Sequence, residues 1–313
     1  MPNFSTHPLV ETAWLTAHLQ DPDLRIVDAR WRGDGSSPEL YKRGHLPGAI
    51  HLDWHHDLSW TNEHGVRDLL LRPASFASVM ESAGIGNSTR VVAYAETDHS
   101  GAARLWWALH YYCHEQVAVL NGGWTKWIAE GRPVSTEKPH PVPTHFIPRP
   151  QPRWLATTAD IEHALTDPNS IVRLIDTRPP EQYAGQAIWT PNGSQWFPPG
   201  QDKIELPDER IMRGGHIPGA IHLHASTTLN PTDWTFRDPA AISQLATTRC
   251  IEQAHRVITY CGVGISASLG LFALYLAGYR NLALYDASWE EWGTDPIHPI
   301  EQRFPNVSPD PTP

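Results

Sequence analysis

The stretch RVITYCGVGISAS, residues 256–268, decides how the chain is read. A run rich in β-branched residues ends at Tyr260, and a helical pattern begins near Ser266. Between them lie Cys261 and two glycines, Gly262 and Gly264. Strand, glycine-rich turn and helix in this order are typical of a parallel α/β unit, whose ligands bind at the carboxyl ends of the strands. The stretch therefore predicts a ligand site with a cysteine at the end of a strand.

The turn that carries Cys261 has the chemistry of an anion site. Glycines let neighbouring backbone N–H groups converge on an anion, and the following helix adds the partial positive charge of its N-terminus. A cysteine in this position favours the thiolate, which is the nucleophilic form. The same N–H groups would stabilise a persulfide anion.

A dinucleotide site is a rival interpretation of the same stretch. Gly262, Gly264 and Ala267 match the pattern G-x-G-x-x-G/A, and Asp286 follows at the end of the next apolar run. Against it, the corresponding segment of the first half, residues 95–101, lacks these glycines. Asp286 also has a structural role available beside Ser288, whose spacing to Glu291 predicts a capping box and a short helix.

A cysteine phosphatase is a second rival. Its loop would need an arginine six positions after the cysteine to hold phosphate, and this chain has Ala267 there. The other cysteines, Cys113 and Cys250, are expected to be structural.

The chain repeats itself, which is a strong indication of its domain organisation. Four segments of the first half recur in the same order in the second half: DAR (28–30) as DTR (176–178), GHLPGAIHL (44–52) as GHIPGAIHL (215–223), RVVAY (90–94) as RVITY (256–260), and GWTKW (123–127) as SWEEW (288–292). Apolar runs at 25–28, 91–94 and 117–120, and again at 172–176, 257–260 and 282–285, predict buried parallel strands. Helical stretches at 102–112 and 266–277 predict helices that flank the sheets. We expect two domains, 1–133 and 153–313, joined by a Pro-rich linker at 134–152.

Composition excludes several functions. The 313 residues are enough for two domains, and a net charge of -10 argues against a nucleic-acid partner. No apolar run approaches the roughly 20 residues of a membrane span, and the N-terminus does not resemble a signal peptide. The 18 histidines show no metal-ligand spacing, so neither a metal nor another cofactor is expected. Three unpaired cysteines indicate a reducing compartment, the cytoplasm.

The tandem D-x-R, G-H-[IL]-P-G-A, Cys-Gly loop and W-x-x-W motifs resemble the rhodanese family over roughly residues 9–292. The resemblance implies an α/β fold of two rhodanese-like domains, each a mostly parallel sheet flanked by helices. It also implies a non-catalytic N-terminal copy, which here has Ala95 in place of the cysteine. Cys261 would be the nucleophile, and the backbone N–H groups that form its cradle would be those of Gly262, Val263, Gly264, Ile265 and Ser266.

The same resemblance implies a sulfurtransferase that works by a ping-pong reaction. Its expected donors are thiosulfate and 3-mercaptopyruvate, its acceptors are cyanide or a thiol, and a thioredoxin-like reductant is a further expected partner. A persulfide relay protein that is fed by a protein partner would use the same loop, and this alternative stays open.

The residues that would bind the donor are less defined. The loop carries no cation, and an arginine that mercaptopyruvate enzymes place near the second D-x-R motif is replaced by Gln182-Tyr183. Arg178, Arg210 and Arg213 are the candidates for contact with the donor anion. The last two belong to the long stretch 184–213, which we expect to cover Cys261 as a lid.

Overall fold

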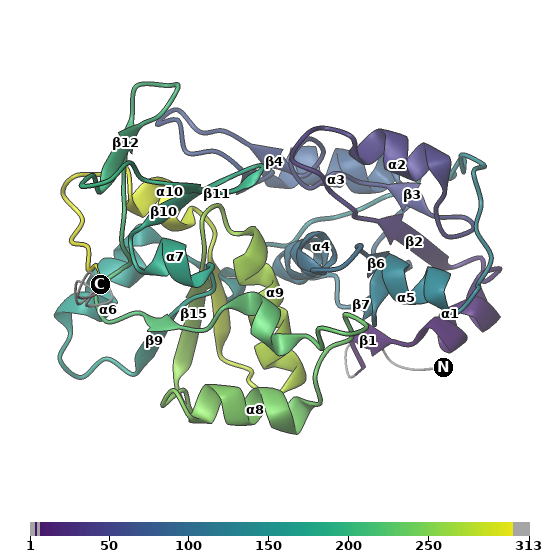
Figure 1. Ribbon diagram of the computed structural model, residues 1–313. Helices are drawn as coiled ribbons and strands as arrows, with labels where there is room; N and C mark the ends of the chain where they lie inside the picture. The colour runs from purple at the N-terminus through teal and green to yellow at the C-terminus, as the bar shows by residue number, and fades with distance from the viewer. Residues whose placement is uncertain (1–3, 5–6, 303–313) are drawn as a thin grey trace, which may run out of the picture.

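The computed structural model describes residue 4 and residues 7–302, which form two α/β units side by side (Figure 1). Each unit contains a five-stranded parallel sheet. An α/β fold of two domains, each a mostly parallel sheet flanked by helices, was predicted, and this architecture is confirmed. The end of the predicted second domain, residues 303–313, lies outside the described residues.

Within the described residues, the first unit is built from twelve elements. In chain order they are β1 (Leu9–Val10), α1 (Thr12–His18), β2 (Leu24–Asp28), α2 (Ser37–Arg43), β3 (Ile50–His51), β4 (Ser59–Trp60), β5 (Leu69–Leu70), α3 (Pro73–Ser82), β6 (Arg90–Tyr94), α4 (Ser100–Tyr111), β7 (Val117–Leu120) and α5 (Gly123–Ala129). Strands β4 and β5 form a separate antiparallel hairpin.

The second unit repeats this plan with additions. Its elements are η1 (Pro152–Trp154), β8 (Leu155–Ala156), α6 (Thr158–Thr166), β9 (Val172–Asp176), α7 (Pro180–Tyr183), β10 (Ala187–Thr190), β11 (Gly193–Trp196), β12 (Lys203–Glu205), β13 (Ile211–Arg213), β14 (Ile221–His222), η2 (Ala225–Thr228), α8 (Pro239–Thr247), β15 (Arg256–Tyr260), α9 (Ile265–Leu276), β16 (Leu282–Tyr285) and α10 (Ser288–Trp292). The two additional antiparallel hairpins, β10–β11 and β12–β13, both arise from the long stretch 184–213.

The two sheets have the same strand order. The first is β1-β7-β6-β2-β3, and the second, taken from its matching edge, is β8-β16-β15-β9-β14. Strand β15, which leads into Cys261, is therefore the central strand of its sheet and is equivalent to β6. Val257–Tyr260 of β15 are all buried, as expected of a parallel strand that is covered on both faces.

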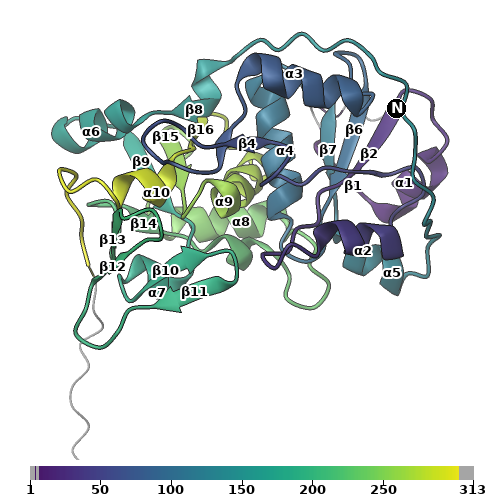
Figure 2. The ribbon, with the colours of Figure 1, turned by 90° about the horizontal axis from the view of Figure 1, so that it is seen from above.

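The domains meet through helices α4 and α9, which lie between the two sheets (Figure 2). The ring of Trp106 on α4 lies 4.9 Å from the ring of Phe272 on α9, in an edge-to-face contact. Both side chains are fully buried in one apolar cluster that extends through both domains. A helix that is apolar on all sides must be buried on all sides, which explains why α4 and α9 are enclosed at this interface.

The linker between the domains is bound to the first domain. From Thr136 to Gln151 it has no helix or strand, and Figure 2 shows it running along the upper edge of that domain. The backbone N–H of Gln151 donates to the carbonyl of Tyr111, and Phe146 is buried. The segment therefore holds the start of the second domain close to α4.

The burial of two histidines, His110 and His114, makes the free energy of unfolding depend on pH. Burial lowers the pKa of both His110 and His114 from 6.5 to about 4. Between these values the unfolded chain binds more protons than the folded chain, so the free energy of unfolding falls as the pH falls from 6.5 towards 4. A difference of about one pKa unit between the folded and the unfolded chain changes the free energy of unfolding by ~1.4 kcal/mol.

Urea unfolding at a series of pH values measures this effect. His114→Phe keeps an aromatic ring and removes the titration, so its free energy of unfolding should decline less steeply with acidity than that of the unaltered chain. Equal slopes for the two proteins would show that His114 is not held neutral by burial.

Candidate active site

Cys261 lies at the carboxyl end of β15, immediately before the N-terminus of α9. The side chain is buried, with 2 % of its surface exposed. Gly264 adopts a left-handed conformation with φ of 79° and brings the chain into the helix. Within the described residues, the backbone N–H groups of Gly262, Val263 and Gly264 have no protein acceptor, and the first N–H groups of a helix have none inside it. The turn thus presents unpaired donors around the cysteine, as an anion cradle requires.

The turn from β16 into α10 holds the Cys261 loop through hydrogen bonds. The backbone N–H of Trp289 donates to the carbonyl of Cys261 at 3.0 Å, and that of Glu290 donates to the carbonyl of Gly262 at 2.8 Å. The N–H of Cys261 donates to the hydroxyl of Ser288 at 3.1 Å. The predicted helix is present, but the predicted capping box is wrong: the helix has no side-chain cap, and the Ser288 hydroxyl donates to the carbonyl of Tyr285 while it holds Cys261.

Both glycines of the loop are required by close packing. A Cβ atom on Gly262 would lie 2.8 Å from the Cβ of Trp189. A Cβ atom on Gly264 would lie 2.8 Å from the carbonyl oxygen of Asp286. The loop is thus confined between the β10–β11 hairpin on one side and the β16–α10 turn on the other.

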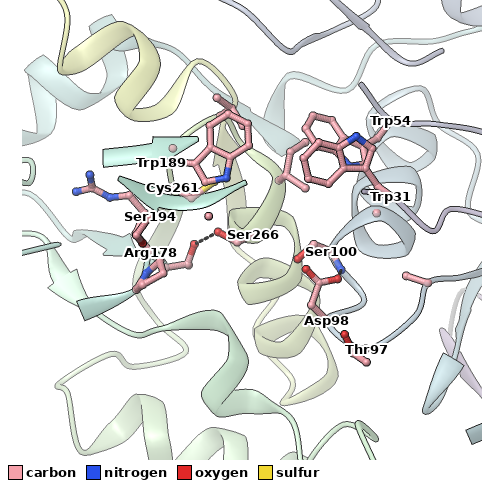
Figure 3. A pocket seen from close by; sticks show the side chains of 18 of the residues that line it. Trp31, Trp54, Thr97, Asp98, Ser100, Arg178, Trp189, Ser194, Cys261 and Ser266 are labelled. Carbon is pink, nitrogen blue, oxygen red and sulfur yellow. Dashed lines mark hydrogen bonds between the residues drawn. The ribbon is translucent and has the colours of Figure 1, made fainter. Parts of the chain in front are cut away.

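A cleft of about 360 Å³ opens over Cys261 and is lined by both domains. Figure 3 shows Trp189 beside Cys261, with Trp31 and Trp54 across the cleft. The second domain contributes the loop, Thr177, Arg178, Pro179, Gln182, Trp189, Gly193, Ser194 and His224. The first domain contributes Ala29, Trp31, Arg32, Trp54, Gly101 and the segment 95–98 with Ser100. The cleft has aromatic walls, and the first domain, which has no cysteine at the position of Cys261, forms part of it.

Arg178 lines the cleft, but its guanidinium is engaged. Its Nε donates to Asp176 Oδ1 at 3.0 Å, its Nη2 donates to the carbonyl of Gly215 at 2.6 Å, and the group lies 4.5 Å from the ring centre of Trp289. Arg30 makes the same contacts in the first domain, which has no cysteine. Arg178 thus joins the strand end to the neighbouring turns, and its contact with a donor stays a prediction.

Arg210 and Arg213, the other expected donor contacts, do not line the cleft. Arg210 pairs with Glu290 at 2.7 Å and with Asp208. Arg213 donates to the carbonyls of Gly293 and His298 at 3.0 and 2.9 Å. Their place at the hairpin β12–β13, outside the cleft, corrects the expectation, because both guanidinium groups are held by α10 and the segment that follows it.

The stretch 184–213, expected to cover Cys261 as a lid, contains one hairpin that lies at the Cys261 loop and one that does not. Of the two hairpins in the stretch 184–213, β10–β11 places Trp189 and Ser194 over the loop, and β12–β13 packs elsewhere. Gln182, at the position of the missing arginine, donates from Nε2 to the Ser194 hydroxyl at 2.9 Å. Ser194 in turn donates to Glu181, so the hairpin is fastened to α7.

The acidic residue that a dinucleotide site would require, Asp286, is already engaged. Asp286 is ion-paired with the fully buried Arg104 of the first domain, and its Oδ2 accepts the backbone N–H of Leu70 at 2.8 Å. The carboxylate is therefore not free to bind a ribose. Sequence reasoning did not identify Arg104, although an arginine within an otherwise apolar helix indicates a buried partner.

The cations of the cleft are all paired, among the residues that the structure describes. Arg32 is ion-paired with Glu96, and Arg178 with Asp176. Burial lowers the pKa of His224, which favours its neutral form. The positive end of the cleft is consequently the loop and the N-terminus of α9. No group of three or more His, Cys, Asp or Glu within the described residues could hold a metal ion, and none of the described helices could span a membrane.

The sequence pattern of the family described as "Rhodanese-like domain" matches residues 11–130 and 157–295. The chain therefore belongs to the rhodanese-like family and contains two copies of its domain.

Relatives of known name extend this result. The chain is 34% identical, over 92% of its length and 94% of the relative's, to the sulfur carrier protein TtuD of Thermus thermophilus. It is 33% identical to a thiosulfate sulfurtransferase of Corynebacterium glutamicum, with 94% and 91% covered. SseA of Escherichia coli, a 3-mercaptopyruvate sulfurtransferase, shares its fold with a TM-score of 0.75 at 24% identity, with 90% of this chain and 98% of that one covered. The relatives of this chain thus include a named thiosulfate sulfurtransferase and a named sulfur carrier.

Proposed function

We propose that the chain transfers a sulfane sulfur from thiosulfate or 3-mercaptopyruvate to cyanide or a thiol through a persulfide on Cys261. The observation that carries the proposal is Cys261 itself, buried at the base of a two-domain cleft and surrounded by unpaired backbone N–H groups at the start of α9. These donors, together with the helix terminus, would stabilise the anionic outer sulfur of a persulfide.

The reaction takes place in two halves. The Cys261 thiolate attacks the outer sulfur of thiosulfate, the S–S bond breaks, and its electron pair leaves with sulfite. With 3-mercaptopyruvate the C–S bond breaks instead, and the pyruvate enolate takes up a proton. The acceptor then attacks the outer sulfur of the persulfide, and Cys261 departs as a thiolate. No external oxidant or reductant is required, and we expect this chemistry in a reducing cytoplasm, which the three free cysteines fit.

A persulfide relay is the second candidate function, because the charges of the cleft favour it. Both proposed donors are anions, and the arginines that line the cleft are already paired with Glu96 and Asp176. A relay protein fed by a partner needs no free cation in the cleft, and one relative is named a sulfur carrier. A thioredoxin-like protein is a suitable acceptor in either function.

Steady-state kinetics with varied donor and varied cyanide separate the two functions. The enzyme proposal predicts thiocyanate formation with at least one donor and parallel double-reciprocal lines, as a ping-pong reaction requires. Loading of Cys261 by a persulfide-bearing protein, with turnover from neither small molecule, would contradict the enzyme and establish the relay.

A further inference from the structure

The turn 286–290 connects the loop that carries Cys261 to the first domain. Its Trp289 and Glu290 backbone N–H groups hold the carbonyls of Cys261 and Gly262, as described above. Two acidic side chains, Asp286 and Glu290, lie at the two ends of this turn, and both are buried. Each is paired with an arginine of the first domain.

The first pair joins Asp286 to Arg104 of helix α4. Arg104 is 0 % exposed, and its Nη2 also donates to the carbonyl of Asp68 at 3.0 Å. A Cβ atom placed on Gly264 would lie 3.2 Å from Arg104 Nη1, so the guanidinium lies directly against the active loop. A buried ion pair constrains its partners strongly, since separation would leave either charge without solvation.

The second pair joins Glu290 to Arg67, which lies just before β5. Arg67 Nε and Nη2 donate to the two carboxylate oxygens at 2.8 and 3.1 Å. This bidentate geometry fixes direction as well as distance. Glu290 is 2 % exposed and is also held by Arg210, so its side chain has little freedom.

The first domain supplies an internal comparison. Its equivalent turn also holds its loop, since the Trp124 N–H donates to the carbonyl of Ala95 at 2.9 Å. It also crosses to the other domain, where Asn121 Oδ1 accepts the backbone N–H of Phe236 at 2.9 Å. Asn121 stands where Asp286 stands, and Thr125 stands where Glu290 stands. The two turns thus make equivalent interdomain contacts, but only the turn beneath the cysteine uses ion pairs.

We propose that Arg104–Asp286 and Arg67–Glu290 are positioning pairs through which the non-catalytic domain holds the persulfide loop in its reactive geometry. The inference rests on the proposed function for its kinetic readout only. A displacement of about 1 Å between reacting groups can reduce a rate by about 100-fold, so a loop held at two points gains rate without touching the substrate.

The matched variants Asp286→Ala and Asn121→Ala test the proposal, because each removes the same interdomain hydrogen bond from one of the equivalent turns. Asp286→Ala should lower kcat for thiocyanate formation by about 10- to 100-fold with little change in KM, and Asn121→Ala should leave both unchanged. Hydrogen exchange should show faster exchange of the Trp289 and Glu290 amides in Asp286→Ala and unchanged exchange of these amides in Asn121→Ala. This second readout needs no substrate, so it judges the proposal even if neither small-molecule donor is used.

Arg67 provides an independent variant that is partly exposed and therefore tolerant of change. Arg67→Gln should lower kcat and increase exchange of the Glu290 amide, and Arg67→Lys should restore part of both. Equal losses in Asp286→Ala and Asn121→Ala, or unchanged amide exchange in the turn of Asp286→Ala and Arg67→Gln, would overturn the proposal.

Discussion

Cys261→Ser is expected to lose sulfur transfer by at least about 10³-fold, because the variant lacks the only group proposed to carry the sulfur. A serine hydroxyl keeps its proton at neutral pH and does not form a persulfide. The side chain is buried and nearly the same size, so the fold should be retained. Thiocyanate formation measures the loss, and unchanged urea unfolding verifies that the variant is folded.

The other two cysteines are the matched controls for this variant. Cys113 and Cys250 are exposed, and both lie outside the cleft. Cys113→Ser and Cys250→Ser should therefore retain full activity. Activity in Cys261→Ser that disappears only when one of the other cysteines is also replaced would place the reaction elsewhere.

Gly264→Ala is expected to reduce sulfur transfer by about 100-fold, as misplaced reacting groups do. Its φ of 79° is strained for alanine by ~1–2 kcal/mol. The added Cβ would also meet the carbonyl oxygen and the Oδ1 of Asp286 at 2.8 and 2.9 Å. Because Asp286 belongs to the turn that supports the Cys261 loop, these close contacts must displace the backbone N–H groups of the cradle.

Gly48→Ala separates backbone strain from the effect on the cradle. Gly48 has a φ of 76°, and a Cβ atom there would meet nothing within 4 Å. It should lose a similar amount of stability to backbone strain while sulfur transfer is retained. Equal activity of Gly264→Ala and Gly48→Ala would show that the cradle tolerates the clash.

The local order of residues predicted much of the fold. The apolar runs that end at Asp28 and Asp176 are strands, as predicted. The repeated D-x-R motif makes the same local contact in both domains, in which the carboxylate accepts the backbone N–H of the arginine. These features depend on neighbours in sequence, and the internal repeat made each of them visible twice. For the same reason Cys261 could be placed at the carboxyl end of its strand before any contact was known.

The donor-binding arginines could not be predicted in this way. Arg210 and Arg213 lie close in sequence to the predicted lid, but whether a guanidinium is free depends on acceptors that are far away along the chain. Those acceptors are Glu290 and the carbonyls that follow α10. The buried ion pair of Arg104 could not be predicted for the same reason, because its partner Asp286 belongs to the other domain.

Intact mass after incubation with each donor tests most directly whether Cys261 carries the sulfur. We expect that thiosulfate or 3-mercaptopyruvate adds one sulfur atom to the chain, that cyanide removes it, and that Cys261→Ser gains nothing under the same conditions. An equal gain of sulfur by Cys261→Ser would contradict the claim that Cys261 carries the persulfide.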